Sequence, residues 1–272
     1  MSGPLDISGL QALVADKAGY ALTADRANAA EARLGPIARR EGVASVQDLI
    51  EGLDPSGRPS LVWEVVETML PADSRFFRDR EPFLLMCSQL LPALAQARDG
   101  RVRVLSAGCA TGQEAWSAAI CAAEAGEALV EIVGLDLSSR AVEKARQGLY
   151  TQFEVQKGLR SRQLIRWFER QDDVWRVSDR LRSSVRFERA NLLDGLEAFG
   201  RFDLIFCRHV LSDMTPEARR RAVAALERAL APNGCLFLGS GEAVPEALAA
   251  FRPVAGLSAV YVRNPSLVSR AA

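Results

Sequence analysis

The segment Arg101-Val-Arg-Val-Leu-Ser-Ala-Gly-Cys-Ala-Thr-Gly-Gln-Glu114 consists of a β-branched run followed by two glycines and an acidic residue. The run predicts a buried strand over 101–106, and the residues from Glu114 to about Gly126 have the composition of a helix. A glycine turn between a strand and a helix is typical of the first βα unit of a parallel sheet, where a ligand approaches the backbone closely.

The chain after this turn alternates between strand-like and helix-like segments. We predict strands over 130–135, 185–187, 202–206, 235–238 and 259–262, helices over 139–148 and 216–230, and a turn at Pro232-Asn-Gly234. The alternation predicts an α/β domain with a mainly parallel, Rossmann-like sheet. Residues 151–185 interrupt it, and Val174-Trp-Arg-Val177 predicts a short strand there, so we expect a small antiparallel β-insertion.

Residues 1 to about 70 have a different character. Apolar residues recur at helical spacing, good helix formers are frequent, and Ser45-x-x-Asp48 has the pattern of a helix N-cap. No strand signal is present. We therefore expect a small all-helical domain over 1–73, followed by an α/β domain over 74–272 that carries the β-insertion at about 170–190.

The glycine turn lacks both signatures of phosphate binding. It is not G-x-G-x-x-G, and it does not end in G-K-[ST]. Glu114 can accept a hydrogen bond from an ammonium group. Asp136 follows Gly112 by 24 residues, at the end of the next strand, and can accept from both hydroxyls of a ribose. S-adenosylmethionine, with S-adenosylhomocysteine as its product, has an amino group and a ribose but no phosphate, so it is a ligand that suits this turn and these two acids.

Each of the two acids also has a simpler interpretation. Glu114 can be a charge at a helix N-terminus that the helix dipole favours, and Asp136 can be the N-cap of the next helix. The order and spacing of the two acids together favour nucleoside binding over these separate structural roles.

The composition excludes several classes of protein. Lysine plus arginine and aspartate plus glutamate both total 34, so there is no overall basic charge for nucleic acid. The five cysteines form no C-x-x-C pair and there is one histidine, so we expect no metal site and reduced cysteines in the core. No signal peptide or membrane-spanning apolar stretch is present, so we expect a cytoplasmic protein without membrane insertion.

Several blocks resemble the CheR-type chemotaxis receptor methyltransferases. Ser74-Arg-Phe-Phe-Arg-Asp79 resembles the family's T-x-F-F-R-[DE] signature, and Ser106-Ala-Gly-Cys-Ala-Thr-Gly-Gln-Glu114 its S-A-x-x-[ST]-G-x-E loop. Further blocks match in order: Gly134–Leu137 with Ala145, Gly148 and Tyr150; Asn191–Leu193; Phe202–Arg208; and Leu230, Pro232, Gly234, Leu238, Gly239 and Glu242. The resemblance extends from about residue 10 to 262.

The resemblance implies a function in chemotactic signal transduction. The protein would transfer a methyl group from S-adenosylmethionine to glutamate side chains of chemotaxis receptors, forming methyl esters for adaptation. The helical domain would recognise the cytoplasmic helices of the receptor, and we expect a monomer. Arg26, Arg33 and Arg40 are spaced by seven and would share one face of a continuous helix, suited to an acidic receptor segment. Pro36 weakens that geometry, and a solvated charged face is the alternative.

The resemblance also implies roles for individual residues. The cofactor-binding set would be Ser74, Arg78, Gly108, Glu114, Asp136, Asn191, Leu192, Arg208 and His209, of which Arg78 and Arg208 would also be catalytic. Glu114 would bind the methionine amino group, Asp136 the ribose, and Asn191 and Leu192 would lie along the adenine. Arg78 would lie beside the acceptor carboxylate; the alternative for Arg78 is an ion pair with Asp79 or Glu81.

The chain departs from the family pattern at three places. His209 replaces the asparagine of C-R-N, Ser212-Asp-Met214 stands where a tyrosine is common, and Ala72 replaces an asparagine. The stretch from Trp167 to Phe187 is short, so we expect no dependence on a receptor tail peptide. The alternatives are a methyltransferase with a different acceptor, a non-enzymatic regulator that binds S-adenosylmethionine, and a nicotinamide dehydrogenase, which the incomplete glycine pattern disfavours.

Overall fold

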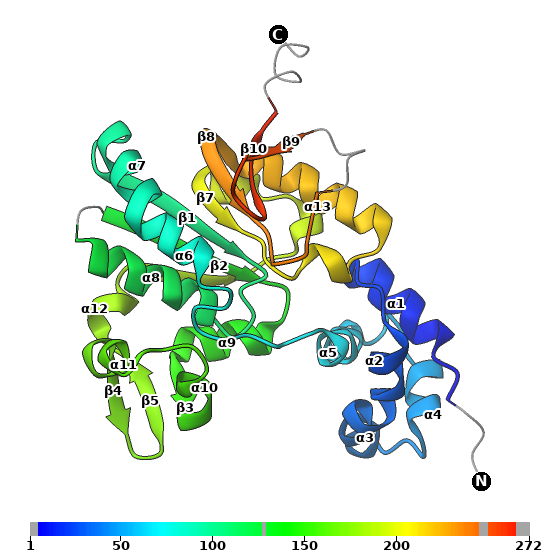
Figure 1. The fold of residues 1–272 in the computed structure, drawn as a ribbon. Helices are drawn as coiled ribbons and strands as arrows, with labels where there is room; N and C mark the ends of the chain where they lie inside the picture. The colour runs from blue at the N-terminus through cyan, green and yellow to red at the C-terminus, as the bar shows by residue number, and fades with distance from the viewer. Residues whose placement is uncertain (1–4, 127–128, 245–249, 265–272) are drawn as a thin grey trace. The chain divides into compact units, whose positions relative to one another are not determined.

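The structure is a computed structural model that describes residues 5–126, 129–244 and 250–264 (Figure 1). The chain divides into two compact units. One comprises the residues up to Pro71 together with Asp213–Arg219, and the other comprises Ala72–Ser212 and the residues from Arg220 onward.

The first unit is helical. Its helices are α1 (Ser8–Ala18), α2 (Ala24–Asn28), α3 (Ala30–Arg40), α4 (Val46–Glu51) and α5 (Pro59–Met69). Their apolar faces meet in a core that includes Leu10, Leu34, Val65 and Met69. The predicted cap is confirmed, because the side chain of Ser45 accepts a hydrogen bond from the Asp48 amide at 3.0 Å.

The predicted arginine face of this unit is wrong. A one-residue turn at Ala29 separates α2, which carries Arg26, from α3, which carries Arg33 and Arg40. Pro36 does not cause the break, because α3 continues through it. Arg26 is paired with Asp213 at 2.9 Å, and Arg40 with Glu64 at 2.6 Å. The sequence spacing of seven therefore does not place the three side chains on one continuous helix.

The second unit contains a seven-stranded sheet in the order β6-β2-β1-β7-β8-β10-β9. Its strands are β1 (Arg101–Ala107), β2 (Leu129–Asp136), β6 (Val185–Arg189), β7 (Phe202–Phe206), β8 (Leu230–Phe237), β9 (Phe251–Pro253) and β10 (Val260–Arg263). The pairs from β6 to β8 are parallel, whereas β10 and β9 are antiparallel. This confirms the α/β class and the Rossmann-like sheet.

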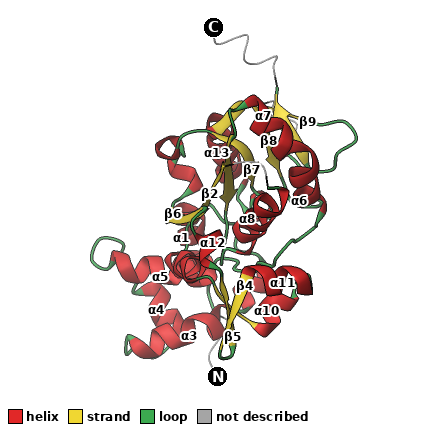
Figure 2. Ribbon diagram, turned by 90° about the vertical axis from the view of Figure 1, so that its left-hand side faces the viewer, coloured by secondary structure: helices red, strands yellow, loops and turns green. Residues whose placement is uncertain are grey.

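Helices pack against the sheet on this unit (Figures 1 and 2). They are α6 (Glu81–Leu85), a π-helical turn (Met86–Leu90), α7 (Leu91–Ala97), α8 (Gln113–Ala125), α9 (Ser139–Gln147) and α13 (Pro216–Ala229). The core between the sheet and the helices is apolar and includes Val104, Trp116, Ile132 and Phe206. Among the described residues, no helix is long and apolar enough to cross a membrane.

The expected antiparallel insertion is confirmed. It is a three-stranded sheet in the order β3-β5-β4, with β3 (Leu149–Thr151), β4 (Phe168–Gln171) and β5 (Val174–Val177). Three short helices accompany it: α10 (Gln152–Gln156), α11 (Ser161–Trp167) and α12 (Asp179–Arg182). Figure 2 shows β4 and β5 apart from the main sheet.

Two local expectations are wrong. Pro232-Asn-Gly234 is not a separate turn, because β8 begins at Leu230 and runs through it to Phe237. The pairing of β8 with β7 is irregular at this point, which accommodates a proline that has no amide hydrogen to donate. The cysteines are also not all reduced: Cys87 and Cys121 form a disulfide, because the π-helical turn and α8 bring their Cα atoms to 5.7 Å.

Candidate active site

The site lies at one edge of the main sheet. Strands β2, β1 and β7 are neighbours and parallel, so their carboxyl ends lie side by side. β1 leads into the glycine turn, β2 ends at Asp136, and β7 is followed by Arg208 and His209. The segment 73–79, which precedes α6, reaches the same edge because Arg208 contacts it directly.

The glycine turn is shaped by protein packing. Gly108 and Gly112 have φ angles of 76° and 94°, which L side chains rarely adopt. A Cβ at Gly108 would lie 2.5 Å from Val210, and one at Gly112 would lie 2.8 Å from Ala145. The hydroxyl of Tyr150 donates to a carbonyl of the turn at 2.7 Å. The expected approach of a ligand is thus not the only reason for these glycines.

Glu114 lies in the first turn of α8 with its carboxylate buried. One oxygen accepts from the Ser106 hydroxyl at 2.7 Å, and the other accepts from Nη1 of Arg208 at 3.2 Å. Burial raises the pKa of Glu114 although the positive charge of Arg208 and the Ser106 hydrogen bond act against the shift. The helix dipole favours this acid, as the simpler interpretation holds, but its side chain faces the site rather than solvent.

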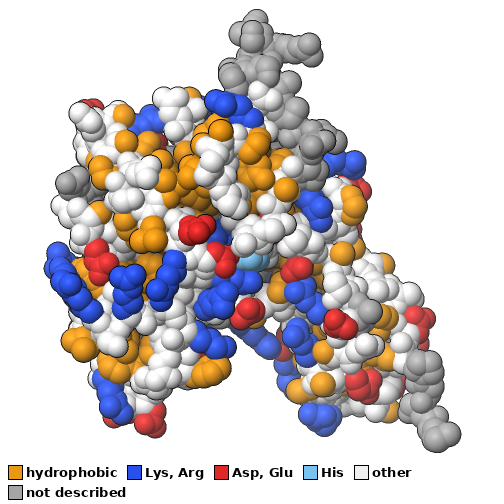
Figure 3. All heavy atoms as spheres, viewed as in Figure 1, with side chains coloured by type: hydrophobic (Ala, Val, Ile, Leu, Met, Phe, Trp, Pro, Cys, Tyr) orange, Lys and Arg blue, Asp and Glu red, His pale blue; other side chains and the backbone are white. Residues whose placement is uncertain are grey.

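Arg208 is the centre of a charged network. Its side chain is 1% exposed, and its Nη2 donates to Asp79 at 2.8 Å and to the Arg78 carbonyl at 2.6 Å. Nε2 of His209 lies 3.0 Å from the same Asp79 oxygen. Burial alone would raise the pKa of Asp79, but the His209 hydrogen bond and the charge of Arg208 outweigh it, so that pKa is lowered. Figure 3 shows acidic and basic side chains on the surface beside the histidine.

The backbone around this network is strained. Four non-glycine residues near it have positive φ angles, namely Phe77 at 48°, Asp79 at 49°, Ala110 at 46° and His209 at 58°. Such conformations cost roughly 1–3 kcal/mol each and persist where the surroundings enforce them, as at functional sites.

Glu242 enforces the conformation of the turn after β7. Its carboxylate accepts from the amides of His209, Ser212 at 3.0 Å and Gly239 at 2.8 Å. A Cβ at Gly239 would lie 2.6 Å from the His209 ring, so this glycine makes room for the imidazole. Glu242 thereby holds the turn that presents Arg208 and His209.

Asp136 is not the N-cap of the following helix. That cap is Ser138, whose hydroxyl accepts from the Ala141 amide at 3.2 Å. Asp136 instead accepts from the amides of Ala110 at 2.8 Å and Ser138 at 2.9 Å. Its carboxylate thus braces the glycine turn from the end of β2.

Asn191 and Leu192 lie at the same edge but do not line the cavity beside Glu114. They follow β6, the neighbour of β2. The Asn191 side chain accepts from the Leu193 amide at 3.0 Å and begins a short 3-10 helix, in which Leu192 is 7% exposed.

Two cavities meet at Arg78. A cavity of about 30 Å³ has walls formed by residues 73–75, Arg78, residues 108–110, Glu114, Arg208 and His209, so Ser74 and Gly108 also border it. A cleft of about 720 Å³ is lined by Arg78, Arg80, Lys157 and neighbouring residues. Arg78 pairs with the exposed Asp73 at 3.8 Å; the structure records no ion pair to Asp79 or Glu81.

The residues around the small cavity fit the amino-acid end of S-adenosylmethionine. Among the described residues, Nε of Arg78 and Nε of Arg208 are buried without hydrogen-bond partners, and a ligand carboxylate can satisfy such donors. Glu114 supplies an acceptor for an ammonium group. No group of His, Cys, Asp or Glu in the described part of the chain has the arrangement of a metal site.

Three residues of this network were not predicted from the sequence. Ser106 binds Glu114, Asp79 binds Arg208 and His209, and Glu242 holds the turn after β7. All three lie inside the quoted motif blocks. Each is a polar residue to which no role was assigned, and that was the signal that could have identified it.

Comparison with known proteins gives matches over most of the chain. The model of a family described as CheR methyltransferase, SAM binding domain, matches residues 72–260. Chemotaxis protein methyltransferase 1 of Pseudomonas aeruginosa is 32% identical over 235 residues, which cover 83% of this chain and 85% of that protein. Chemotaxis protein methyltransferase Cher2 of Pseudomonas putida is 28% identical over 252 residues, 89% of this chain and 92% of that protein.

Another relative is described as acting in a different process. Probable biofilm formation methyltransferase WspC of Pseudomonas aeruginosa is 31% identical over 196 residues, which cover 69% of this chain and 46% of that protein.

Proposed function

The chain belongs to the CheR methyltransferase family and uses S-adenosylmethionine, and from this premise we propose that it forms methyl esters on glutamate side chains of chemotaxis receptors. The single observation that carries the proposal is the position of Arg78 between the cofactor cavity and the larger cleft. The relatives named as chemotaxis methyltransferases support the acceptor class.

The cofactor supplies an electrophilic methyl group on a sulfonium. Glu114 would accept from its ammonium, and Asp136, next to Ala110 of the glycine turn, would accept from the ribose. The unpaired Nε atoms of Arg78 and Arg208 would donate to its carboxylate. Asn191 and Leu192 would lie along the adenine, because β6 neighbours the strand that ends at Asp136.

The acceptor needs orientation rather than activation. A glutamate side chain has an ordinary pKa of about 4.3, so it is already a nucleophilic carboxylate at neutral pH. A guanidinium can hold a carboxylate with two parallel hydrogen bonds. Arg78 would hold the acceptor in this way from the cleft, and alignment of two reactants contributes up to about 7–11 kcal/mol.

Arg208 and His209 would act by holding Asp79 and the strained segment beside it. The Nη2 of Arg208 binds both the Arg78 carbonyl and the Asp79 carboxylate, which fixes the backbone from which the Arg78 side chain extends. His209 replaces the asparagine expected from the resemblance and supplies a second donor to Asp79.

The helical domain over 1–73 would recognise the cytoplasmic helices of the receptor, and the α/β domain over 74–272 would carry the reaction. We propose that the protein acts as a cytoplasmic monomer. Arg26 and Arg40 are already paired with acidic residues, and Arg33 donates to the Thr68 carbonyl at 3.3 Å, so recognition would use the unit's whole charged surface rather than one arginine row.

A second candidate is methyl transfer to a receptor-like protein outside chemotaxis. The similarity to WspC favours it. The chemistry would be the same and only the acceptor protein would differ, so the two candidates are separated by the choice of membranes in one assay.

The test is methylation with methyl-labelled S-adenosylmethionine and membranes that carry chemoreceptors. We expect label on the receptor band that base releases as methanol, and its loss in Arg78→Ala. Arg228→Ala is the matched control, because Arg228 is an exposed arginine paired with Glu197 on the surface. Cofactor binding without any base-labile label on receptors that another enzyme methylates would contradict the proposal.

A further inference from the structure

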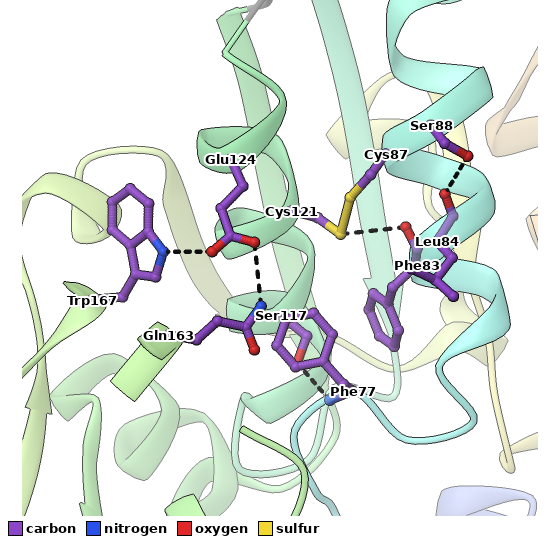
Figure 4. Close-up of a disulfide and its surroundings, with 10 residues drawn as sticks. All are labelled: Phe77, Phe83, Leu84, Cys87, Ser88, Ser117, Cys121, Glu124, Gln163 and Trp167. Carbon is purple, nitrogen blue, oxygen red and sulfur yellow. Dashed lines mark hydrogen bonds between the residues drawn. A yellow bond between two sulfur atoms is a disulfide. The ribbon is translucent and has the colours of Figure 1, made fainter. Parts of the chain in front are cut away.

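The disulfide between Cys87 and Cys121 joins two elements that carry the site. Cys87 lies on the π-helical turn after α6, and Cys121 lies on α8, which begins beside Glu114 (Figure 4). Their Cα separation of 5.7 Å is the usual one for a disulfide. In a cytoplasmic protein such a bond is usually transient and redox-sensing rather than structural.

Small reagents can reach the sulfur atoms. A cavity of about 260 Å³ is lined by both cysteines, by the apolar side chains of Phe77 and Leu84, and by Arg80 and Arg160. Cys87 is half-buried, whereas Cys121 is 5% exposed. Cys87 is therefore the accessible partner and Cys121 the resolving one.

Both redox states fit the same backbone. The Cys121 sulfur lies 3.3 Å from the Phe83 carbonyl oxygen. In the reduced protein the Cys121 thiol has this carbonyl as an acceptor, so breaking the disulfide does not leave a buried donor unpaired.

The disulfide is mechanically connected to the site through Phe83. The Phe83 ring packs against Phe77 at 5.3 Å and stacks on Phe206 at 5.4 Å, and the Arg208 guanidinium lies over it at 5.5 Å. The Phe77 amide also donates to Ser117 on α8 at 2.9 Å (Figure 4). The segment that bears Arg78 and Asp79 is thus tied to α8 directly by the Phe77 hydrogen bond and, by way of α6, by the disulfide.

The disulfide opposes the movement that cofactor binding requires. The cavity beside Glu114 has a volume of about 30 Å³, whereas ligand sites usually measure ~300–1,000 Å³. The methionine end would fit into this cavity if the wall formed by residues 73–75 and Arg78 moved away from Glu114. A covalent bond between the turn after α6 and α8 limits this movement.

We propose that Cys87 and Cys121 form a reversible redox-modification site for peroxides and low-molecular-weight thiols, and that the disulfide form restricts entry of S-adenosylmethionine. The restricted entry of S-adenosylmethionine rests on the proposed function, because it concerns the same cofactor site.

The chemistry balances with these two reagents. The Cys87 thiolate attacks a peroxide oxygen, the O–O bond breaks, and the leaving hydroxide takes a proton to give water. The Cys121 thiolate then attacks the resulting sulfenic acid, forming the disulfide and releasing a second water. Two thiol molecules reverse the reaction by exchange and leave as their own disulfide.

The experiment compares the full chain after hydrogen peroxide with the same sample after dithiothreitol. Alkylation and peptide mass mapping report the cysteine state, and calorimetry with S-adenosylhomocysteine reports binding. We expect a Cys87–Cys121 cross-linked peptide and roughly tenfold weaker or slower binding in the oxidised protein, both reversed by thiol, with tenfold corresponding to ~1.4 kcal/mol.

Variants separate this site from the other cysteines. Cys87→Ser and Cys87→Ala should bind S-adenosylhomocysteine equally well under both conditions, whereas Cys235→Ser, at a half-buried free cysteine, should respond like wild type. Peroxide that leaves the pair reduced, or a disulfide that forms without any change in binding, overturns the inference. Redox-dependent binding without receptor methylation would contradict the proposed function alone.

Discussion

Arg208 and Arg40 each contact two carboxylates, but their surroundings differ. The Arg208 side chain is 1% exposed and holds Asp79 and Glu114, whereas the Arg40 side chain is 53% exposed and holds Glu41 and Glu64. A buried ion pair that loses one partner leaves a desolvated charge behind, whereas a solvated pair is replaced by water. Burial, and not the number of ion pairs, therefore decides which arginines the site depends on.

The largest expected effect is on Arg208. Arg208→Met leaves two carboxylates without their shared cation, and we expect the free energy of unfolding of the α/β unit to fall by about 3–5 kcal/mol. Urea unfolding followed by tryptophan fluorescence measures it. Arg40→Met, the matched control in the helical unit, should leave the transition unchanged. Equal urea midpoints for Arg208→Met and Arg40→Met would contradict the role assigned to burial.

Arg78 should separate activity from stability. Its side chain is partly exposed, and its ion pair with Asp73 is loose, so Arg78→Ala should leave the unfolding midpoint nearly unchanged. Loss of a preorganised donor at a reacting group typically costs on the order of 10²–10³ in rate. Single-turnover methylation measures it, with Arg78→Lys intermediate because lysine cannot bind a carboxylate bidentately. A normal rate in Arg78→Ala would remove this residue from the mechanism.

Glu114 should give cofactor binding a characteristic pH dependence. The ionised carboxylate would accept more strongly than the protonated one from the ammonium of S-adenosylmethionine, and burial raises the pKa of Glu114 above its ordinary value. Affinity should therefore weaken as pH falls, beginning at a higher pH than a solvent-exposed glutamate with a pKa of about 4.3 would produce.

Glu114→Gln provides the control for this profile. Loss of a hydrogen bond to a charged group costs ~1.5–3 kcal/mol, so affinity at neutral pH should fall by roughly 10–150-fold. Calorimetric titration from neutral to acidic pH should give a flatter curve for the variant than for wild type. An equally steep curve in Glu114→Gln would assign the dependence to another carboxylate.

Arg26, whose side-chain exposure lies between those of Arg208 and Arg40, should show a small loss of stability. Arg26 and Asp213 have side chains about one-quarter exposed and lie 2.9 Å apart. Arg26→Ala should destabilise the helical unit by about 0.2–1 kcal/mol, less so at high salt. Thermal unfolding at low and high salt measures this, and a loss as large as that of Arg208→Met would show that burial is not the deciding variable.

Much of the fold followed from local pattern. β5 and β7 have the predicted bounds, and the alternation of strands and helices gave the parallel sheet because each element's periodicity is set by its own burial. The path of β8 through Pro232 could not be predicted from local pattern, since it depends on pairing with β7. The one-residue turn at Ala29 could likewise not be predicted, because alanine is a good helix former.

The site was predictable where a motif names its residues and hidden where partners come from distant segments. Glu114 and Arg208 were named, but their direct pairing across 94 positions was not. Close approach of a ligand was an incomplete explanation for Gly112, because a Cβ there would also lie too close to Ala145 and Tyr150. Cys87 and Cys121 carried no signal, since cysteines 34 residues apart pair only when the fold brings their helices together.

The central claim is that the cleft beside Arg78 presents a glutamate carboxylate to S-adenosylmethionine. The most direct measurement is peptide mass spectrometry of chemoreceptors incubated with the protein and deuteromethyl S-adenosylmethionine. Deuteromethyl groups on glutamate side chains, removed by mild base and absent with Arg78→Ala, are the predicted result. Label confined to other residue types, or label on glutamates that persists in Arg78→Ala, would contradict it.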